Sequence, residues 1–315
     1  MSRTLLSIRH LEVPEIESLL QLSKEHKDRV LNGMPPAPAA SRTIGLLFFE
    51  NSTRTRVSFE QAANYSGYRV SNFIAEASSL SKGETLKDTI RTLRSERLDA
   101  VVIRHKSSGS AQLAAQFFGG PVINAGDGEH EHPTQALADA LTILEHKGRL
   151  DGLKVAIVGD VLHSRVARSN AWLLEKMGAD VRLVGPPNLL PAETGKLPGE
   201  FYQSLLPALQ DADVVMCLRL QKERMMEGLL ASVGQYRRGY QVNRETLMVA
   251  KDDCIVMHPG PLNRGVELDD FAADGPHSVI GEQVENGIYV RMAALSWVFG
   301  ESLAPVKAKA AKVNA

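Results

Sequence analysis

A run of hydroxyl and arginine side chains stands near the start of the chain, in the segment Ser52-Thr53-Arg54-Thr55-Arg56. It follows an apolar stretch at residues 43–49 and precedes a helical pattern at 57–66. Free backbone N–H groups at a helix start, together with hydroxyl side chains, bind anions. Arginines at this end oppose the helix dipole, so they are unfavourable unless an anion joins them. The segment therefore predicts a phosphate site, and a solvated helix cap is the alternative.

Three further side chains stand where α/β proteins bind ligands. Arg104 ends an apolar stretch, so it would lie at the carboxyl edge of a sheet. His132 and Gln135 stand at the start of a helical pattern, residues 133–147. A histidine can donate to a carbonyl oxygen, and a glutamine can accept from an amide nitrogen. These side chains would suit a polar carbonyl ligand, and the run 127–132, rich in acidic and histidine side chains, could instead supply metal ligands.

The second half of the chain carries two more arginines in comparable positions. Arg165 opens a helical pattern, where its charge suits a substrate carboxylate, and Arg219 follows an apolar stretch at 213–218. The turn after the stretch 154–159 is similar to a nucleotide-fold turn. It lacks the dinucleotide fingerprint, because Val161 and Ser164 stand where glycines are needed. A nicotinamide dehydrogenase is therefore a poor interpretation of this segment.

Short apolar stretches alternate with longer helical patterns along the whole chain. The stretches are rich in Val, Ile and Leu and end in polar, Gly or Pro residues, which is typical of strands buried on both faces. They span residues 43–49, 69–74, 100–104, 121–124, 154–159, 180–185, 213–218 and 254–258. The helical patterns between them have apolar stripes. The alternation predicts an α/β fold with two domains, each a mainly parallel sheet flanked by helices.

The length of 315 residues accommodates two cores of ordinary size. We expect a first domain at residues 1–135 and a second at 136–283. A connection at 147–152 leads from a helical pattern into a new strand. The apolar helix predicted at 284–304 needs a partner surface. The Lys/Ala-rich tail at 305–315 has no core residues and should be frayed.

The composition limits the classes of function. Hydrophobic residues make up 43% and charged residues 23%, the balance of a globular protein in water. A net charge of -1 gives no overall field that would favour nucleic acid or an anionic membrane. Cys217 and Cys254 are far apart beside apolar runs, so we expect buried thiols rather than a disulfide or a zinc site. No stretch is typical of a signal peptide or a membrane span, and we expect a cytoplasmic protein.

The segment 52–56, followed by Val-Ser-Phe-Glu, resembles the carbamoyl phosphate motif of the aspartate and ornithine carbamoyltransferases. Four further segments resemble the same superfamily in the same order, at residues 79–85, 102–105, 132–135 and 258–261. The resemblance runs from about Leu5 to Phe299. It implies an active site in the cleft between the domains and at a subunit interface, and a last helix that crosses back to the first domain.

The resemblance also implies roles for single residues. One group surrounds carbamoyl phosphate: Ser52, Thr53, Arg54, Thr55, Ser79, Arg104, His132, Gln135, Gly260 and Pro261. Within it, Thr55, Arg104 and His132 would stabilise charge on the carbonyl oxygen, and a cis bond would precede Pro261. A second group binds aspartate: Lys82, Arg165, Arg219 and Gln221. We expect no metal and no organic cofactor, because the transfer needs no Lewis acid.

Lys82 lies among small residues, in a segment that resembles the superfamily loop reaching into a neighbouring subunit's site. The serine-to-lysine spacing is one shorter than in some relatives. Ser78, Ser79 or Ser81 could therefore contact phosphate, and we favour Ser79. The resemblance implies a homotrimer of catalytic chains. Two such trimers could assemble with three regulatory-chain dimers, or the trimer could associate with a dihydroorotase.

The segment from Arg219 to Arg224 resembles the aspartate-specific branch, and its charges would repel the cationic side chain of ornithine. Residues 258–265 also lack the cysteine of ornithine enzymes. The predicted reaction transfers the carbamoyl group to L-aspartate, an early committed step of pyrimidine synthesis. Domain closure would bring Arg219 inward, with 235–241 as a mobile loop. The alternatives are a carbamoyltransferase for another amino acid and an inactive structural partner in a pyrimidine-enzyme assembly.

Overall fold

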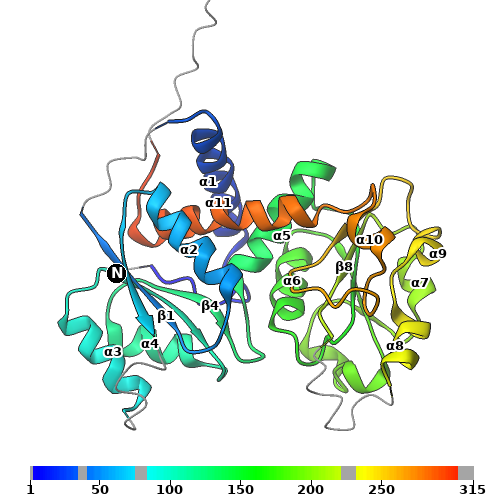
Figure 1. Cartoon of the computed structure of the whole chain (residues 1–315), viewed down its shortest axis with the longest axis horizontal. Helices are drawn as coiled ribbons and strands as arrows, with labels where there is room; N and C mark the ends of the chain where they lie inside the picture. Colours follow the sequence, from blue (N-terminus) through cyan, green and yellow to red (C-terminus); the bar gives the residue numbers. More distant parts are fainter. Residues whose placement is uncertain (1–2, 35–40, 75–83, 221–231, 304–315) are drawn as a thin grey trace, which may run out of the picture.

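The computed structural model describes residues 3–34, 41–74, 84–220 and 232–303. Over these residues the chain forms two α/β domains side by side, each built on one sheet (Figure 1). The first sheet has the order β2-β1-β3-β4, with strands β1 (Thr43–Phe48), β2 (Arg69–Ile74), β3 (Ala100–His105) and β4 (Val122–Asp127). The second has the order β7-β6-β5-β8-β9, with strands β5 (Lys154–Val158), β6 (Asp180–Val184), β7 (Glu200–Tyr202), β8 (Val214–Cys217) and β9 (Ile255–Met257).

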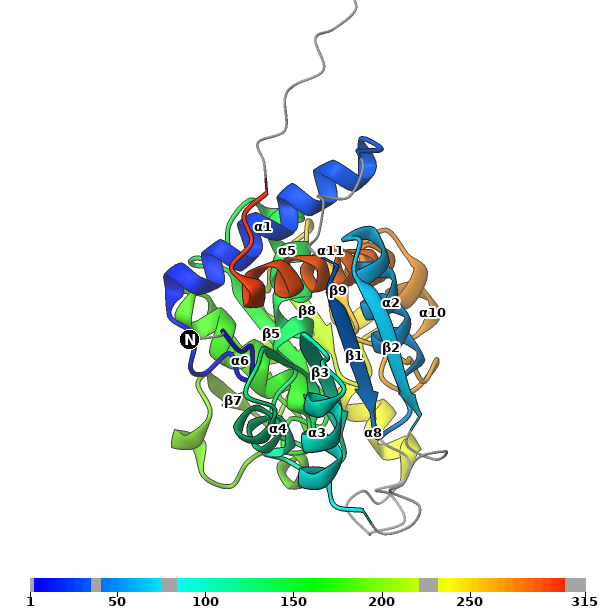
Figure 2. The same ribbon diagram turned by 90° about the vertical axis from the view of Figure 1, so that its left-hand side faces the viewer.

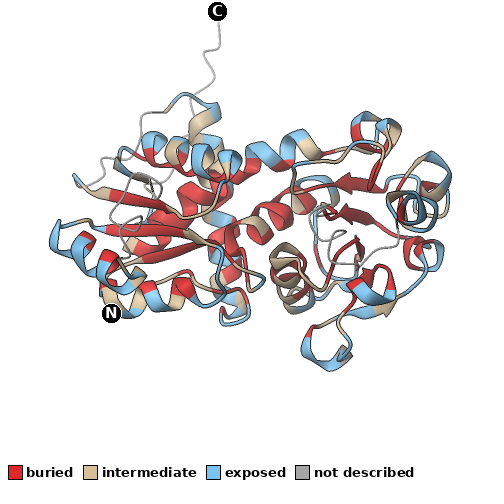
Figure 3. Cartoon of the chain, turned by 60° about the horizontal axis from the view of Figure 1, so that its bottom comes forward, coloured by how far each residue is buried: buried red, intermediate tan, exposed pale blue. Residues whose placement is uncertain are grey.

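Every pairing within the two sheets is parallel. In the first sheet β1 is central, so Ile44 lies opposite Val70 on one side and Ala100 on the other. The strands are apolar because helices cover both faces of each sheet, and the strands are largely buried (Figure 3). Strands β4 and β8 are buried along their whole length. The carboxyl ends of β1, β3, β4, β5, β8 and β9 lead to the cavity between the domains, which is where open α/β sheets bind ligands.

The helices connect the strands and cover the sheets. In chain order the first domain contains α1 (Val13–Leu31), α2 (Thr53–Tyr65), α3 (Leu86–Ser95), α4 (Ser110–Phe118) and α5 (Pro133–Lys147). The remaining helices are α6 (Arg165–Lys176), α7 (Leu205–Leu209), α8 (Val233–Tyr240), α9 (Arg244–Leu247), α10 (Asp270–Asp274) and α11 (Ile280–Phe299), with short 3-10 turns η3 (Pro187–Leu189) and η4 (Thr194–Lys196).

Helix α11 runs from the second domain back across the first, where it packs against α1, α2 and α5 (Figure 2). It is buried over most of its length, which explains why its sequence is apolar on nearly all sides. Polar contacts fix its position: His26 Nε2 lies 3.0 Å from Ser296 Oγ, and Arg291 donates to Ser58 Oγ at 2.8 Å. The helices α5 and α6 pack together where the domains meet.

The prediction of two parallel-sheet domains is confirmed, and some details of the elements differ. Helix α2 begins at Thr53 rather than at 57, because Ser52 is its N-cap. The prediction of a loop at 235–241 is wrong, because these residues belong largely to α8. Ser232 caps this helix by accepting from the N–H of Gln235 at 3.1 Å. Helix α4 and strand β7 were not predicted. The domain boundary at 135 falls inside α5, and its position stays a prediction.

Both cysteines are buried free thiols, as predicted. Among the residues that the structure describes, no helix is both long enough and apolar enough to cross a membrane.

Candidate active site

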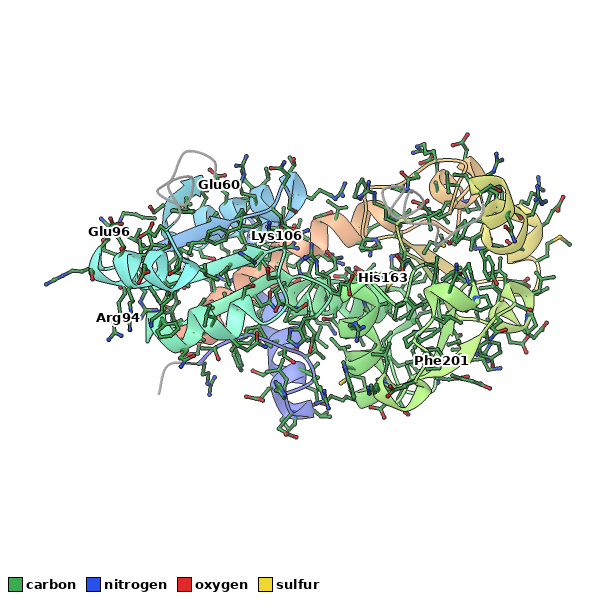
Figure 4. All side chains as sticks on the ribbon, turned by 90° about the horizontal axis from the view of Figure 1, so that it is seen from below. Glu60, Arg94, Glu96, Lys106, His163 and Phe201 are labelled. Atoms are coloured by element: carbon green, nitrogen blue, oxygen red, sulfur yellow. The ribbon has the colours of Figure 1, made fainter. Side chains whose placement is uncertain are left out.

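A cavity of about 1050 Å³ lies between the two domains. The first domain contributes the start of α2, the end of β3 and the start of α5, and the second contributes the turns after β5, β8 and β9. Lys106 and His163, which both line the cavity, mark the region where the domains meet in Figure 4. Each of these positions follows the carboxyl end of a strand or begins a helix, so backbone N–H groups and side chains converge there.

The predicted anion segment forms the first turn of α2. Ser52 is its N-cap, and Thr53, Arg54 and Thr55 follow within the first turn, all lining the cavity. No acidic side chain occupies this turn. Partial burial lowers the pKa of Arg54, and the positive charge of Arg219 lowers it further. An anion bound between these two arginines would attract both guanidinium groups and so offset their repulsion. It would also interact favourably with the positive end of the helix dipole.

The side chains of Thr55, Arg104 and His132 meet at the wall of the cavity. The Nη1 of Arg104 lies 3.3 Å from Thr55 Oγ1 and 3.4 Å from His132 Nε2. Arg104 reaches them from the end of β3, and Thr55 and His132 stand at the starts of α2 and α5. This convergence gives a carbonyl oxygen three polar groups at one point, as charge stabilisation of an acyl-transfer transition state requires.

His132 is buried and neutral. Burial is the main cause of its lowered pKa, and the nearby Arg104, Arg291 and Arg165 act in the same direction. An arginine can only donate, so the contact of Arg104 with His132 Nε2 is a hydrogen bond when the ring proton is on Nδ1, whereas donation by His132 to a bound carbonyl oxygen needs the proton on Nε2. The backbone N–H of His132 donates to Ser169 Oγ at 2.8 Å and ties the start of α5 to α6.

Glu50 joins two of the predicted site arginines. Its Oε1 accepts from Arg104 Nε at 2.7 Å and forms a close ion pair with Arg165 Nη2. Arg165 also donates to the carbonyl oxygen of Gly128 at 3.1 Å. Sequence reasoning missed Glu50, although one signal was present: it lies just before the anion segment, beyond the carboxyl end of β1. The carboxylate holds two cations from different domains against the same cavity.

The turn after β9 brings the second domain to the phosphate segment. The cis bond predicted between Gly260 and Pro261 is confirmed. The N–H of Gly260 donates to His258 Nδ1 at 2.8 Å, and His258 Nε2 lies 3.2 Å from Glu267 Oε1. The guanidinium of Arg54 occupies the space into which a side chain at Gly260 would project. Gly260 and Pro261 therefore line the cavity opposite the start of α2.

Arg219 lines the cavity just beyond β8. The next residue is held in place, because Asn263 Nδ2 donates to the carbonyl oxygen of Leu220 at 2.8 Å. The other predicted contacts of this part of the site, Gln221, Ser79 and Lys82, lie outside the described residues. So do Ser78 and Ser81, so the choice of phosphate-binding serine stays a prediction.

Behind the cavity wall lies a polar network that sequence reasoning also missed. Gln135, which lines the cavity, donates to the buried Asp139 at 2.8 Å, and Gln283 donates to the same oxygen at 2.8 Å. Asn170 donates to the other oxygen of Asp139 at 2.7 Å. One signal was available, since an acidic residue on the apolar stripe of a helix must find buried donors.

The residues in this cavity suit anionic substrates and a polarised carbonyl group. Arg54, Arg104, Arg165 and Arg219 supply positive charge from both domains. The described residues contain no group of three His, Cys, Asp or Glu side chains that could hold a metal ion. Two α/β domains with cations converging on an interdomain cavity suit an enzyme that transfers a group between two anionic substrates.

Comparison with known proteins identifies the family within this class. Residues 3–145 match the family model "Aspartate/ornithine carbamoyltransferase, carbamoyl-P binding domain", and residues 151–298 match "Aspartate/ornithine carbamoyltransferase, Asp/Orn binding domain". The chain belongs to the aspartate/ornithine carbamoyltransferase family. The aspartate carbamoyltransferase catalytic subunit of Granulibacter bethesdensis is 53% identical over 293 residues, which cover 92% of this chain and 93% of that protein. The corresponding subunit of Ruminiclostridium cellulolyticum is 50% identical, with coverages of 93% and 94%.

Solved structures show the same fold. The ornithine carbamoyltransferase of Pyrococcus furiosus superposes with a TM-score of 0.85 at 33% identity, covering 95% of this chain and 97% of that chain. Aspartate transcarbamoylase from Trypanosoma cruzi, in complex with carbamoyl aspartate and phosphate, gives a TM-score of 0.85 at 33% identity, covering 93% and 95%. These matches confirm the predicted fold class.

Proposed function

We propose that this chain catalyses the transfer of the carbamoyl group of carbamoyl phosphate to L-aspartate, giving N-carbamoyl-L-aspartate and phosphate. The observation that carries the proposal is the contact of Arg104 with both Thr55 and His132, beside the anion segment of α2. The curated relatives named above are aspartate enzymes. Carbamoyl aspartate is a pyrimidine precursor, so the reaction belongs early in that synthesis.

Carbamoyl phosphate would bind against the first domain. The first turn of α2 would hold the phosphate through Ser52, Thr53, Arg54 and Thr55. Ser79 and Lys82 of a neighbouring chain would complete this site. The carbonyl oxygen would receive hydrogen bonds from Thr55, Arg104 and His132. Gln135 and the turn at Gly260 and Pro261 would orient the amide nitrogen, because carbonyl oxygens accept from an NH2 group.

Aspartate would bind between the phosphate segment and the second domain. Arg165 would take its α-carboxylate, since this guanidinium lines the cavity from the start of α6. Arg219 would take the β-carboxylate, assisted by Gln221 and by Lys82. A negatively charged substrate relieves the repulsion between Arg54 and Arg219. A cationic side chain such as that of ornithine would add to it.

The reaction forms one C–N bond and breaks one C–O bond. The neutral amine of aspartate attacks the carbonyl carbon, and negative charge gathers on the oxygen facing Arg104, Thr55 and His132. The C–O bond to phosphate then breaks with its electron pair, and the departing phosphate can accept the proton of the amine. Catalysis rests on positioning two anions in one cavity and on stabilising the developing charge.

We propose a homotrimer in which Lys82 of one chain completes a neighbour's site, as the resemblance of its segment implies. Regulatory-chain dimers or a dihydroorotase could bind such trimers. The cytoplasm, where both substrates are metabolites, is the expected location.

The function is tested with the purified chain, carbamoyl phosphate and aspartate. N-carbamoyl-aspartate and phosphate should appear in equal amounts, with no turnover of ornithine or N-acetylornithine. Preference for another amine substrate would support the alternative of a different carbamoyltransferase. If a folded trimer carbamoylated no amino acid, the result would support the alternative of an inactive structural partner.

A further inference from the structure

Asp139 is a buried carboxylate one helical turn after Gln135 on α5. Its exposed fraction is 0%, and it accepts three hydrogen bonds from side-chain amides. Oδ1 accepts from Gln135 and Gln283, each at 2.8 Å, and Oδ2 accepts from Asn170 at 2.7 Å. The donors come from α5, α11 and α6, so this carboxylate lies where three helices of the two domains meet.

The carboxylate determines which end of each amide faces it, because an ionised carboxylate accepts and cannot donate. The NH2 group of Gln135 is turned toward Asp139, which leaves its oxygen as the acceptor for a ligand in the cavity. The same constraint acts on Gln283. Its NH2 group faces Asp139, and its oxygen accepts from the backbone N–H of His258 at 2.9 Å, at the start of the turn that includes Gly260.

We propose that Asp139 is a positioning residue that makes the site specific for the carbamoyl amide. By fixing Gln135 with its oxygen toward the ligand, it favours a substrate that donates from an NH2 group. Acetyl phosphate has the same shape but carries a methyl group at that position, so it gains nothing from this acceptor. The inference rests on the proposed function, because it assumes that carbamoyl phosphate is the ligand beside Gln135.

The charge of Asp139 is sensitive to pH. Burial raises its pKa to about 6, although its three amide donors and Arg291 of α11 act in the opposite direction. Its partners from α5 and α6 are neutral amides, and Arg291 is itself buried, with a pKa lowered to about 10. A protonated Asp139 can donate to an amide oxygen. Gln135 would then turn its NH2 group toward the cavity, where it faces the NH2 group of the substrate.

The test measures the dissociation constants of carbamoyl phosphate and acetyl phosphate by calorimetry, and compares their ratio between proteins. In Asp139→Asn one of the two acceptor oxygens becomes a donor, so the orientation of Gln135 is no longer fixed. The preference for carbamoyl phosphate should fall roughly threefold to tenfold, the effect of one hydrogen bond of ordinary net strength. Asp213→Asn is the matched control, because Asp213 is a buried carboxylate bound to Lys251 away from the cavity.

The double substitution Asp139→Asn with Asn170→Asp separates positioning from general damage. The new carboxylate at position 170 would accept from the new amide at 139 and turn the oxygen of 139 back toward Gln135 and Gln283. The preference should therefore return. A role in folding alone predicts no such recovery, and a ratio equal to that of the single variant would overturn the proposal. So would a single variant with the ratio of the wild type.

The wild-type protein provides a test that needs no substitution. The phosphate groups of the two ligands titrate alike, so their ratio reports on the protein. The preference for carbamoyl phosphate should decline as pH falls from 7 through about 6, where Asp139 gains its proton. A constant ratio between pH 7.5 and 5 contradicts the proposal, even if the variants do not fold. If the wild type discriminates but does not carbamoylate aspartate, the proposed function fails and the positioning role stands.

Discussion

The guanidinium of Arg54, in the first domain, lies where a side chain on Gly260, in the second domain, would project. A Cβ atom at Gly260 would stand 2.8 Å from Arg54 Cζ and 3.0 Å from Arg54 Nε, which is too close for either to remain in place. Arg54 can therefore hold its position in the phosphate segment only because residue 260, in the other domain, has no side chain. Gly260 also has a φ of 69°, which L side chains rarely adopt.

Gly260→Ala should weaken carbamoyl phosphate binding by displacing Arg54. Loss of one charge-assisted hydrogen bond corresponds to about 1.5–3 kcal/mol, roughly tenfold to a hundredfold in KM for carbamoyl phosphate. Gly265→Ala is the control, because Gly265 has a similar φ of 74° but nothing within 4 Å of its Cβ position. The control should lose stability and keep its KM. Equal changes in KM for both variants would mean that backbone strain, and not Arg54, is responsible.

Arg219→Ala should impair aspartate use while leaving carbamoyl phosphate binding nearly unchanged. Removing one partner of a buried charge pair costs on the order of 2–5 kcal/mol, and here the cost should appear in the KM for aspartate. Arg149→Ala, an exposed arginine outside the cavity, is the control. Steady-state kinetics with each substrate varied in turn gives the answer. Comparable increases in the KM values of both substrates would show that the assignment of Arg219 to the aspartate site is wrong.

The sequence predicted the arrangement of the site better than its supporting contacts. Arg104 lies at the end of a strand, and Arg54 and Arg165 lie at the starts of helices, positions that the carboxyl edge of a parallel sheet collects. These three residues do line one cavity. Their assigned contacts with substrate stay predictions, as do those of Ser79, Lys82 and Gln221.

Glu50 and Asp139 could not be predicted in the same way. The partners of Glu50 stand 54 and 115 positions away, and Gln283 stands 144 positions from Asp139. A single acidic residue has no periodic pattern, so its importance depends on which helices the fold brings together. The orders of the strands in the two sheets could not be predicted either. Alternation of strands and helices predicts parallel pairing, but it does not determine which strands are neighbours.

Stability should decline as pH falls from 6.5 toward 4, partly because of His26. Burial is the main cause that lowers its pKa to about 4, with the charge of Arg29 second. In the unfolded chain His26 has a pKa of 6.5, so it takes up a proton at a higher pH than in the folded chain. The contribution of neutral His26 to stability is therefore complete above pH 6.5 and is lost progressively below it. His26→Gln should reduce this acid loss by about 2 kcal/mol at pH 5.

Urea unfolding of wild type and His26→Gln at pH 7 and pH 5 measures this difference. Asp139 acts in the opposite direction, because its pKa is raised from 3.8 to about 6 and its charged form is the less stable one. Its contribution is the same in both proteins and cancels in the comparison. Parallel loss of stability in the two proteins would exclude His26 as a cause.

The shared active site gives the last prediction. Arg54→Ala and Lys82→Ala trimers should each be nearly inactive, since each change removes a cation from every site. If Lys82 reaches the Arg54 of a neighbouring chain, a mixed trimer must contain one interface at which both residues are intact, because cyclic symmetry pairs unlike patches.

Dissociating the two variants, mixing them in equal amounts and reassembling them should therefore restore activity. Three quarters of randomly assembled trimers are mixed, and each has one intact site of three, so recovery should approach about a quarter of the wild-type value. A charge tag on one variant separates mixed trimers from the parents and shows that exchange has occurred. Each parent, taken alone through the same steps, is the control. Mixed trimers as inactive as their parents would mean that each site is built within a single chain.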